Sequence, residues 1–165
     1  MYRIAFGFLL ALAGCAAPAP QTVIRDGSVA ISSAALFDAA RFAGDWHVVA
    51  AYGAEAGCGP LRESWAVTGP GRYDVTGTRC AALGLRRFDA TAQISGPGRI
   101  TRAGSEALWV LWVDADYRVA VIGTPSGAFG RIISRDKGAR GDLFAAARDV
   151  LDFNGYDISR LILLN

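Results

Sequence analysis

The stretch FDAARFAGDWHVVA, residues 37–50, decides how the fold of this chain is interpreted. Successive side chains of a β-strand point to opposite faces of the sheet. An inward Trp46 therefore places Val48 and Ala50 inward as well, and it places His47 outward at the surface. We expect this stretch to begin the first strand of a sheet whose core contains the Trp46 ring.

Downstream of this stretch, turn residues recur at short, regular intervals and separate runs of strand length. Examples are Gly69-Pro70-Gly71 and Gly96-Pro97-Gly98. The expected strands are residues 46–52, 62–68, 72–79, 86–95, 98–103, 107–113, 117–123 and 128–135. Eight such strands without a long connection predict an all-β fold, an eight-stranded antiparallel up-and-down barrel with room for one small ligand. The alternative is a sandwich of the same strands, which would need longer Greek-key crossovers.

The hydrophobic pattern changes to a helical period after the last of these strands. One helical face carries Leu143, Phe144, Ala147, Val150 and Leu151. Asp142 is the expected N-cap, and Asn154-Gly155 is the expected stop. Strand 107–113 is apolar on both faces, so we expect this C-terminal α-helix to pack against it outside the barrel. Residues 161–164 are expected to add a short closing strand.

The N-terminus carries the pattern of an export signal. The apolar run Ile4–Ala13 follows Arg3 and is too short to span about 30 Å of hydrocarbon, so residues 1–14 are predicted to be a signal peptide. The order Leu-Ala-Gly-Cys ending at Cys15 resembles a bacterial lipobox, which implies cleavage before Cys15 and lipidation of its thiol. The alternative is an ordinary secretory signal cut near Ala16, which would leave the protein free in the periplasm.

A lipidated Cys15 would anchor the chain without a transmembrane helix, because each buried acyl methylene contributes roughly 0.8 kcal/mol. The next residue is Ala16 and not aspartate, which by resemblance to lipoproteins favours the outer membrane, with the periplasmic face as the expected location. The expected organisation is therefore a signal peptide at residues 1–14, a lipidated tether at 15–35 and a barrel domain at 36–165.

Charge and cysteine content exclude several classes of function. Removal of the signal peptide takes Arg3 from the 17 basic residues and leaves 16 against 15 acidic ones, so a nucleic-acid partner is not expected. In an oxidising compartment Cys58 and Cys80 are expected to form a disulfide, with a free reactive thiol as the alternative. One histidine and two separated cysteines make no zinc ligand set, and neither a metal nor a cofactor is expected.

Residues 37–50 resemble the opening of a lipocalin, specifically of the bacterial outer-membrane lipoprotein branch. Two later segments support this resemblance: LWVDADYRVAVIGTP resembles the second family motif, and RIISR, which ends at Arg135, resembles the third. The C-terminal segment DVLDFNGYDISRLILLN resembles the helix end and closing strand of the bacterial members. The resemblance covers about residues 36–165 and is weakest between about 53 and 105.

In the family, these motifs gather at the closed end of the barrel, where the arginine packs over the tryptophan ring. A guanidinium stacked on an indole is worth about 0.5 to 2 kcal/mol. The resemblance implies that the structural residues of this end are Gly44, Trp46, Asp116, Tyr117 and Arg135.

The candidate ligand-binding residues are one arginine and four aromatic residues. They are Trp65, Tyr73, Phe88, Trp112 and Arg131. Arg131 shares a strand face with Phe129 and Ile133 and is suited to clamp a carboxylate or phosphate near apolar walls, although a solvated strand position is an equal interpretation. The four aromatic residues either line a cavity or simply fill the core.

The resemblance implies a membrane-tethered, non-enzymatic carrier or scavenger of a fatty acid, a lysophospholipid or a similar small hydrophobic ligand. The alternative is a scaffold lipoprotein whose barrel is filled and whose loops contact another envelope protein. An enzyme would need a nucleophile and a base, for which the sequence offers only Ser64 with His47 or a reduced cysteine. We therefore do not expect an enzyme.

Overall fold

The computed structural model describes residues 23–164, apart from the side chains of Ala54 and Ala56. The predicted signal peptide and the predicted lipidation site at Cys15 lie outside the described residues. Within the described part, no helix is long and apolar enough to cross a bilayer.

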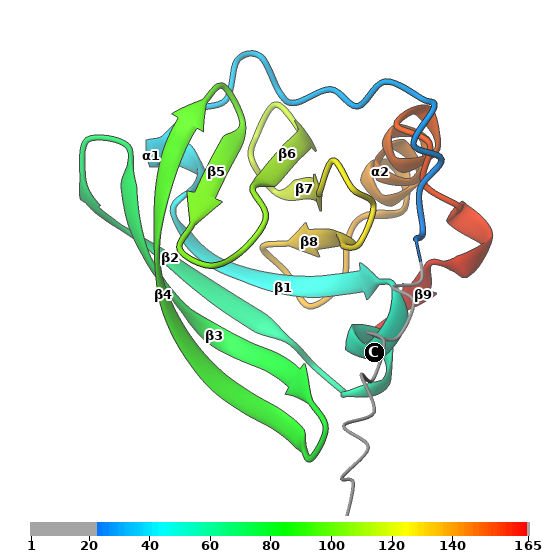
Figure 1. Cartoon of the computed structure of the whole chain (residues 1–165), viewed down its shortest axis with the longest axis horizontal. Helices are drawn as coiled ribbons and strands as arrows, with labels where there is room; N and C mark the ends of the chain where they lie inside the picture. Colours follow the sequence, from blue (N-terminus) through cyan, green and yellow to red (C-terminus); the bar gives the residue numbers. More distant parts are fainter. Residues whose placement is uncertain (1–22, 165) are drawn as a thin grey trace, which may run out of the picture.

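Eight antiparallel strands close into a barrel in the order of the sequence (Figure 1). They are β1 (Gly44–Ala51), β2 (Arg62–Gly69), β3 (Arg72–Ala81), β4 (Gly84–Gly96), β5 (Arg99–Arg102), β6 (Leu108–Val113), β7 (Val119–Gly123) and β8 (Gly130–Ser134). The sheet closes because β1 pairs with both β2 and β8. The predicted up-and-down barrel is confirmed, and this closure excludes the sandwich, whose two sheets would not join in one ring.

The long β3–β4 hairpin extends beyond the other strands at the lower end of Figure 1. Its two strands pair continuously, from Arg72 opposite Gln93 to Ala81 opposite Gly84. By contrast, β5 pairs with β4 only between Ala92 and Gly96. Residues 84–91 of β4 therefore have no strand on their second side in the described part of the chain, and the barrel is open there.

The buried side chains form two clusters, one inside the barrel and one outside it. The largest side chains of the inner cluster include Phe42, Trp46, Trp65, Tyr73 and Ile100. The outer cluster joins the outward side chains of β7 and β8, such as Val121 and Ile132, to Leu151 of helix α2 (Gly141–Phe153). Helix α2 packs against β6 and β7, which confirms the expected position of the helix outside the barrel.

A β-bulge in β1 changes which side chains face the barrel interior. The register between β1 and β8 shifts between Val48 and Ala50. Trp46 and Val48 belong to the inner cluster, as predicted, whereas Ala50 belongs to the outer cluster. The prediction of an inward Ala50 is wrong, because the extra residue of a bulge reverses the alternation of side chains.

Helix α2 begins two residues earlier than its pattern predicts. Its N-cap position is Arg140, so the prediction that Asp142 is the N-cap is wrong. Asp142 instead lies in the first turn, where its carboxylate pairs with the Arg140 guanidinium. Its negative charge also interacts favourably with the positive end of the helix dipole. The predicted stop is confirmed: Asn154 is the C-cap, and Gly155 follows with a φ of 81°.

Short elements complete the chain at both ends of the barrel. Helix α1 (Ala39–Phe42) precedes β1, and the 3-10 helix η1 (Gly53–Gly57) connects β1 to β2. After α2, the 3-10 helix η2 (Ile158–Arg160) leads into β9 (Ile162–Leu163), which pairs with the last residues of β1 outside the barrel. The expected closing strand is thus present but shorter than the predicted range.

The later part of the predicted tether packs against the domain. Arg25 is buried and donates hydrogen bonds to the Asn154 carbonyl at 2.7 Å and to the Pro125 carbonyl at 3.1 Å. The neighbouring Ile24 is a buried member of the outer cluster. These contacts hold the segment before α1 against the end of α2.

Candidate functional site

The closed end of the barrel is held by the Arg135 guanidinium. Its carbon lies 3.7 Å from the centre of the Trp46 ring, and its nitrogens donate to the carbonyl oxygens of five residues. Those residues are Tyr117, Asp45, Arg41, Phe42 and Ala43. Gly44 has a φ of 101°, and a Cβ there would approach Arg135 Nη1 to 3.1 Å. The arginine, tryptophan and glycine of the motif thus form one structural unit, as the resemblance implied.

The turn between β6 and β7 is organised by Asp114. Its carboxylate accepts hydrogen bonds from the backbone N–H groups of Arg118 and Val119, both at 2.6 Å, and from that of Asp116 at 3.1 Å. Asp116 itself is exposed and pairs with Arg118 at 2.9 Å. The structural role expected of Asp116 therefore belongs to Asp114, because an aspartate at the start of a turn can cap the N–H groups that follow. The hydroxyl of Tyr117 accepts a hydrogen bond from the backbone N–H of Asp38 at 2.7 Å and so positions the N-cap residue of α1.

Trp65 and Tyr73 fill the inner cluster and are almost completely buried. Their rings meet edge to face with centroids 5.3 Å apart, and Trp65 makes a similar contact with Phe42 at 5.3 Å. The Tyr73 hydroxyl donates to the Ala39 carbonyl at 2.7 Å. Of the two interpretations given for these aromatic residues, the structure favours the filled core over the cavity wall.

Arg131 lies inside the barrel in a buried ion pair. Its side chain is 3% exposed, and its Nη2 lies 2.6 Å from Oε2 of Glu63, which is 4% exposed. The same Glu63 oxygen accepts the indole N–H of Trp65 at 3.0 Å. The interpretation of Arg131 as a solvated strand residue is therefore wrong, and the guanidinium is already engaged by a carboxylate of the protein itself.

Two more charged side chains complete what we call the inner charge cluster: Glu55, Glu63, Arg102 and Arg131. Glu55 Oε1 lies 4.0 Å from Arg131 Nη1, and the charges of both glutamates act on Arg102. Three buried atoms of the cluster have no hydrogen-bond partner among the described residues. They are Glu55 Oε2, Arg102 Nε and Arg131 Nε. A buried polar group without a partner is costly, so these atoms mark a place suited to a polar ligand group.

Burial and pairing shift the acid–base properties of this cluster in different directions. Burial raises the pKa of Glu55 above its ordinary value of 4.5, although Arg131 opposes this shift. Burial lowers the pKa of Arg102. Burial would also lower the pKa of Arg131, but the charges of Glu63 and Glu55 reverse this effect and raise it. Burial thus makes the Glu55 carboxyl easier to neutralise than an exposed glutamate.

The open half of the barrel forms a hollow that we call the vestibule, defined by Arg79, Phe88, Ala90 and Arg102. These side chains line a cleft of about 500 Å³ at the free edge of β4. Phe88 and Ala90 lie opposite Gly77 and Val75 of β3, and both are half-buried. Arg87 and the Asp89 carboxylate also line this cleft. The vestibule therefore combines apolar wall atoms with three guanidinium groups and one carboxylate, and Arg102 links it to the inner charge cluster.

Comparison with known proteins decides the family. The family model described as "Lipocalin-like domain" matches residues 37–165. The chain belongs to the lipocalin-like family. A comparison with curated proteins gives no match for this lipocalin-like chain.

Solved structures share the lipocalin fold at low sequence identity. The siderocalin Ex-FABP, described as functioning through dual ligand specificities, is 23% identical with a TM-score of 0.60, over 75% of this chain and 93% of that chain. Lobster apocrustacyanin A1 is 17% identical with a TM-score of 0.60, over 76% and 77%. The cockroach allergen Per a 4 is 14% identical with a TM-score of 0.66, over 85% and 96%. At these identities the likeness establishes the fold.

Trp112 does not line the lipocalin barrel, although strand alternation from Leu108 and Val110 would place it inward. A second bulge shifts the register of β6 with β7 between Val110 and Trp112. Trp112 consequently lies opposite Val121 and packs against the outer cluster. Its prediction as a ligand-binding residue is corrected: its ring supports the docking of α2.

Three members of the inner charge cluster were not predicted from the sequence: Glu55, Glu63 and Arg102. Alternation could have found two of them, because Glu63 is two residues from the inward Trp65 and Arg102 is two residues from the inward Ile100. No local signal identifies Glu55, which reaches the cluster from η1. Of the four aromatic residues predicted to bind a ligand, Phe88 lies at the vestibule.

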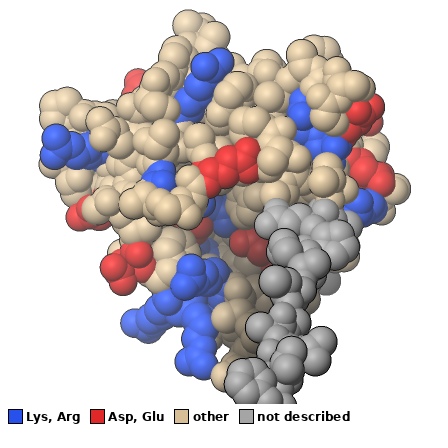
Figure 2. Space-filling view, in the orientation of Figure 1, with Lys and Arg blue, Asp and Glu red and all other residues tan. Residues whose placement is uncertain are grey.

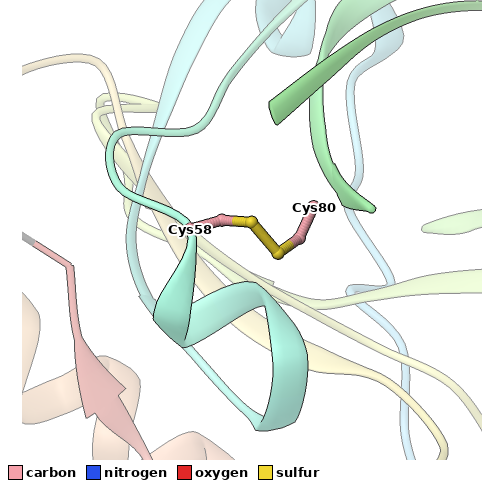
Figure 3. The surroundings of a disulfide bond; sticks show 2 residues. All are labelled: Cys58 and Cys80. Carbon is pink, nitrogen blue, oxygen red and sulfur yellow. A yellow bond between two sulfur atoms is a disulfide. The ribbon is translucent and has the colours of Figure 1, made fainter. Parts of the chain in front are cut away.

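Cys58 at the end of η1 and Cys80 of β3 form the predicted disulfide (Figure 3). The bond ties the β3–β4 hairpin to the segment that carries Glu55. His47 and Ser64, the pair considered for an enzyme, are not joined by a hydrogen bond in the described part of the chain. The described residues also hold no cluster of side chains suited to a metal ion.

Proposed function

We propose that this lipocalin-like chain is a non-enzymatic carrier or scavenger that binds an amphipathic anion, such as a fatty acid or a lysophospholipid, in the vestibule. The observation that carries this proposal is the inner charge cluster, which leaves two guanidinium Nε donors, of Arg102 and Arg131, without a partner among the described residues. A carboxylate or phosphate is the natural acceptor for such donors. Phe88 and Ala90 supply apolar contact for the adjoining alkyl chain.

The charge balance of the cluster supports an anionic ligand. Two arginines and two glutamates give a formally neutral cluster, but burial raises the pKa of Glu55 and favours the neutral form of this carboxyl. A neutral Glu55 leaves a net positive charge beside Arg102. The ligand anion then takes the place of the Glu55 charge in the pairing with the two arginines.

The relatives support a binding role in a general way. The siderocalin of the same fold is described as functioning through dual ligand specificities. For this chain the proposal rests on the vestibule and its charges, because the side chains of the inner cluster around Trp65 and Tyr73 fill the closed half of the barrel.

That filled closed half favours a second candidate, a scaffold lipoprotein that binds no small ligand. Phe42, Trp46, Trp65 and Tyr73 are almost completely buried in it. In this candidate the inner charge cluster only fixes the relative positions of the strands. The same binding experiment distinguishes the two functions.

The test is titration of the full chain with a fluorescent dansyl fatty acid. Saturable binding near one ligand per chain is expected, with displacement by an unlabelled fatty acid. Arg102→Gln should weaken binding about tenfold or more, since a hydrogen bond to a charged group contributes about 1.5 to 3 kcal/mol. Glu55→Gln should strengthen binding because it removes a competing carboxylate.

Arg99→Gln is the matched control, because Arg99 lies on the same strand but stacks outside the barrel on Trp109, at 4.3 Å from the ring centre. It should bind the fatty acid like the unmodified chain. The uncharged methyl ester of the same acid should bind equally to the unmodified chain and to Arg102→Gln. Absence of saturable binding to the unmodified chain would reject the carrier and favour the scaffold.

We also propose that the chain belongs to the bacterial outer-membrane lipoprotein branch of the family and is anchored through a lipidated Cys15. The Leu-Ala-Gly-Cys order and the residue Ala16 support this proposal. Mass spectrometry of the N-terminal peptide should find acyl groups on Cys15. The Cys15→Ser chain should move from the membrane fraction to the soluble fraction, and an unmodified Cys15 in membrane-extracted protein would contradict the anchor.

A further inference from the structure

The tip of the β3–β4 hairpin combines exposed apolar residues with basic ones. Leu83 is 85% exposed at the turn, and Leu85 is 44% exposed. The segment from Thr78 to Phe88 contains three arginines and no acidic residue. We call this segment the hairpin tip. Figure 2 shows basic side chains gathered at the lower end of the molecule, where Figure 1 places the hairpin.

The basic residues of the hairpin tip repel one another. Arg79 lies directly opposite Arg86 in the register of β3 and β4, and Arg87 follows on the other face of the strand. None of the three forms an ion pair or a side-chain hydrogen bond among the described residues. Like charges directly opposite each other destabilise a sheet, so an external anion beside them would stabilise this arrangement.

The hairpin tip is also held in place. The disulfide joins Cys80, next to Arg79, to Cys58 at the end of η1, and Leu85 lies opposite Cys80. Ten continuous residue pairs join the two strands behind the turn. A braced turn presents its side chains to a partner with little loss of conformational entropy on binding.

We infer that the hairpin tip is a docking element for an anionic lipid bilayer, with Leu83 inserted between headgroups and the three arginines at the level of the lipid phosphates. A soluble polyanion would satisfy the arginines but leave Leu83 in water, and a neutral bilayer would accept Leu83 but leave the like charges unpaired. A bilayer with anionic headgroups satisfies both. Because Arg79 and Arg87 also line the vestibule cleft, docking would bring the opening of the barrel to the membrane surface.

Docking by the hairpin tip requires no acyl chain at Cys15 and is tested without one. The full chain carrying Cys15→Ser is mixed with phosphatidylcholine vesicles that either contain or lack phosphatidylglycerol. In this background Leu83→Trp should show a blue-shifted emission, and brominated acyl chains should quench it, only when phosphatidylglycerol is present. Subtraction of the Cys15→Ser parent removes the signal of the four native tryptophans. Leu36→Trp is the control, because Leu36 is 95% exposed near the closed end.

The arginines are tested by vesicle partitioning in the same background. Arg86→Gln/Arg87→Gln should weaken partitioning into phosphatidylglycerol vesicles about 30-fold, because each basic residue near an anionic surface is worth roughly a factor of five. Arg72→Gln/Arg148→Gln has the same net charge and should change it little. Equal losses in both double variants, or no quenching at position 83, would overturn the inference. Quenching that is equally strong with pure phosphatidylcholine vesicles would overturn the claim that docking requires anionic headgroups.

Discussion

Arginine has different surroundings at the two ends of this barrel. At the closed end, Arg135 donates to five backbone carbonyl oxygens and stacks on Trp46. At the open end, Arg79 and Arg86 face each other without a partner among the described residues. A guanidinium whose nitrogens all donate hydrogen bonds within the protein stabilises the fold, whereas one without such partners can bind a ligand. Arg131 lies between these extremes, because its Nη2 pairs with Glu63 whereas its Nε has no hydrogen-bond partner in the described part of the chain.

The largest effect should come from separating the buried ion pair. Glu63→Leu leaves the Arg131 charge buried and the indole N–H of Trp65 without its acceptor, so we expect a loss of about 4 kcal/mol in the free energy of unfolding. Urea denaturation measures this loss. Glu63→Leu/Arg131→Met should recover most of it. Equal losses in the single and double variants would show that packing, and not the buried charge, dominates at this position.

The closed end should respond strongly to loss of its guanidinium. Arg135→Ala removes the donors for five carbonyl oxygens together with the cation over Trp46, and we expect a loss of about 3 kcal/mol in stability. Thermal unfolding followed by circular dichroism provides the measurement. Arg86→Ala is the matched variant at the open end and should cost almost nothing. Similar losses at both ends would contradict the contrast between them.

Asp114 gives the closed end a smaller and pH-dependent contribution. Burial alone would raise its pKa, but hydrogen bonds from Val119, Arg118 and Asp116 hold the pKa of Asp114 below its ordinary value of 3.8. The folded state therefore gains stability above that ordinary value and loses it as the pH falls through the lowered one. Asp114→Asn should cost about 1 to 2 kcal/mol at neutral pH. The difference from the unmodified chain should shrink in acid unfolding below about pH 4, and a difference independent of pH would contradict this account.

The smallest effect should be a gain at the open end. Arg86→Gln relieves the repulsion with Arg79, and we expect about 0.5 kcal/mol more stability in the absence of vesicles. Urea denaturation at low and high salt tests this expectation, because salt screens exposed charges. The gain should shrink at high salt. A loss of stability in Arg86→Gln would mean that Arg86 has a structural partner after all.

The sequence predicts the elements of this fold well because their signals are local. Turn residues such as Gly96-Pro97-Gly98 separate the strands, and the helical period around Leu151 marks α2. The order of the strands follows from their short connections. The contact between Trp46 and Arg135, which lie far apart in the chain, was implied by the resemblance to lipocalins and not by a local signal.

The remaining features depend on contacts between distant parts of the chain. Alternation can place Glu63 and Arg102 on inward faces, but no local pattern shows which side chains they meet. The inner charge cluster draws Glu55 from η1, Glu63 from β2, Arg102 from β5 and Arg131 from β8, and only the closed barrel brings them together. The role of Trp112 depends on a bulge, and one extra residue in a strand leaves no clear mark in its hydrophobic pattern.

The bulges in β1 and β6 let one strand contribute side chains to the inner cluster along one part of its length and to the outer cluster along another. In β1, Trp46 and Val48 belong to the inner cluster, whereas Val49 and Ala50 belong to the outer one. In β6, Val110 faces the interior and Trp112 faces the helix. Positions that face the interior are thereby separated from positions that contact α2. Substitutions at the interior positions can therefore change the barrel lining without changing the residues that pack against the helix.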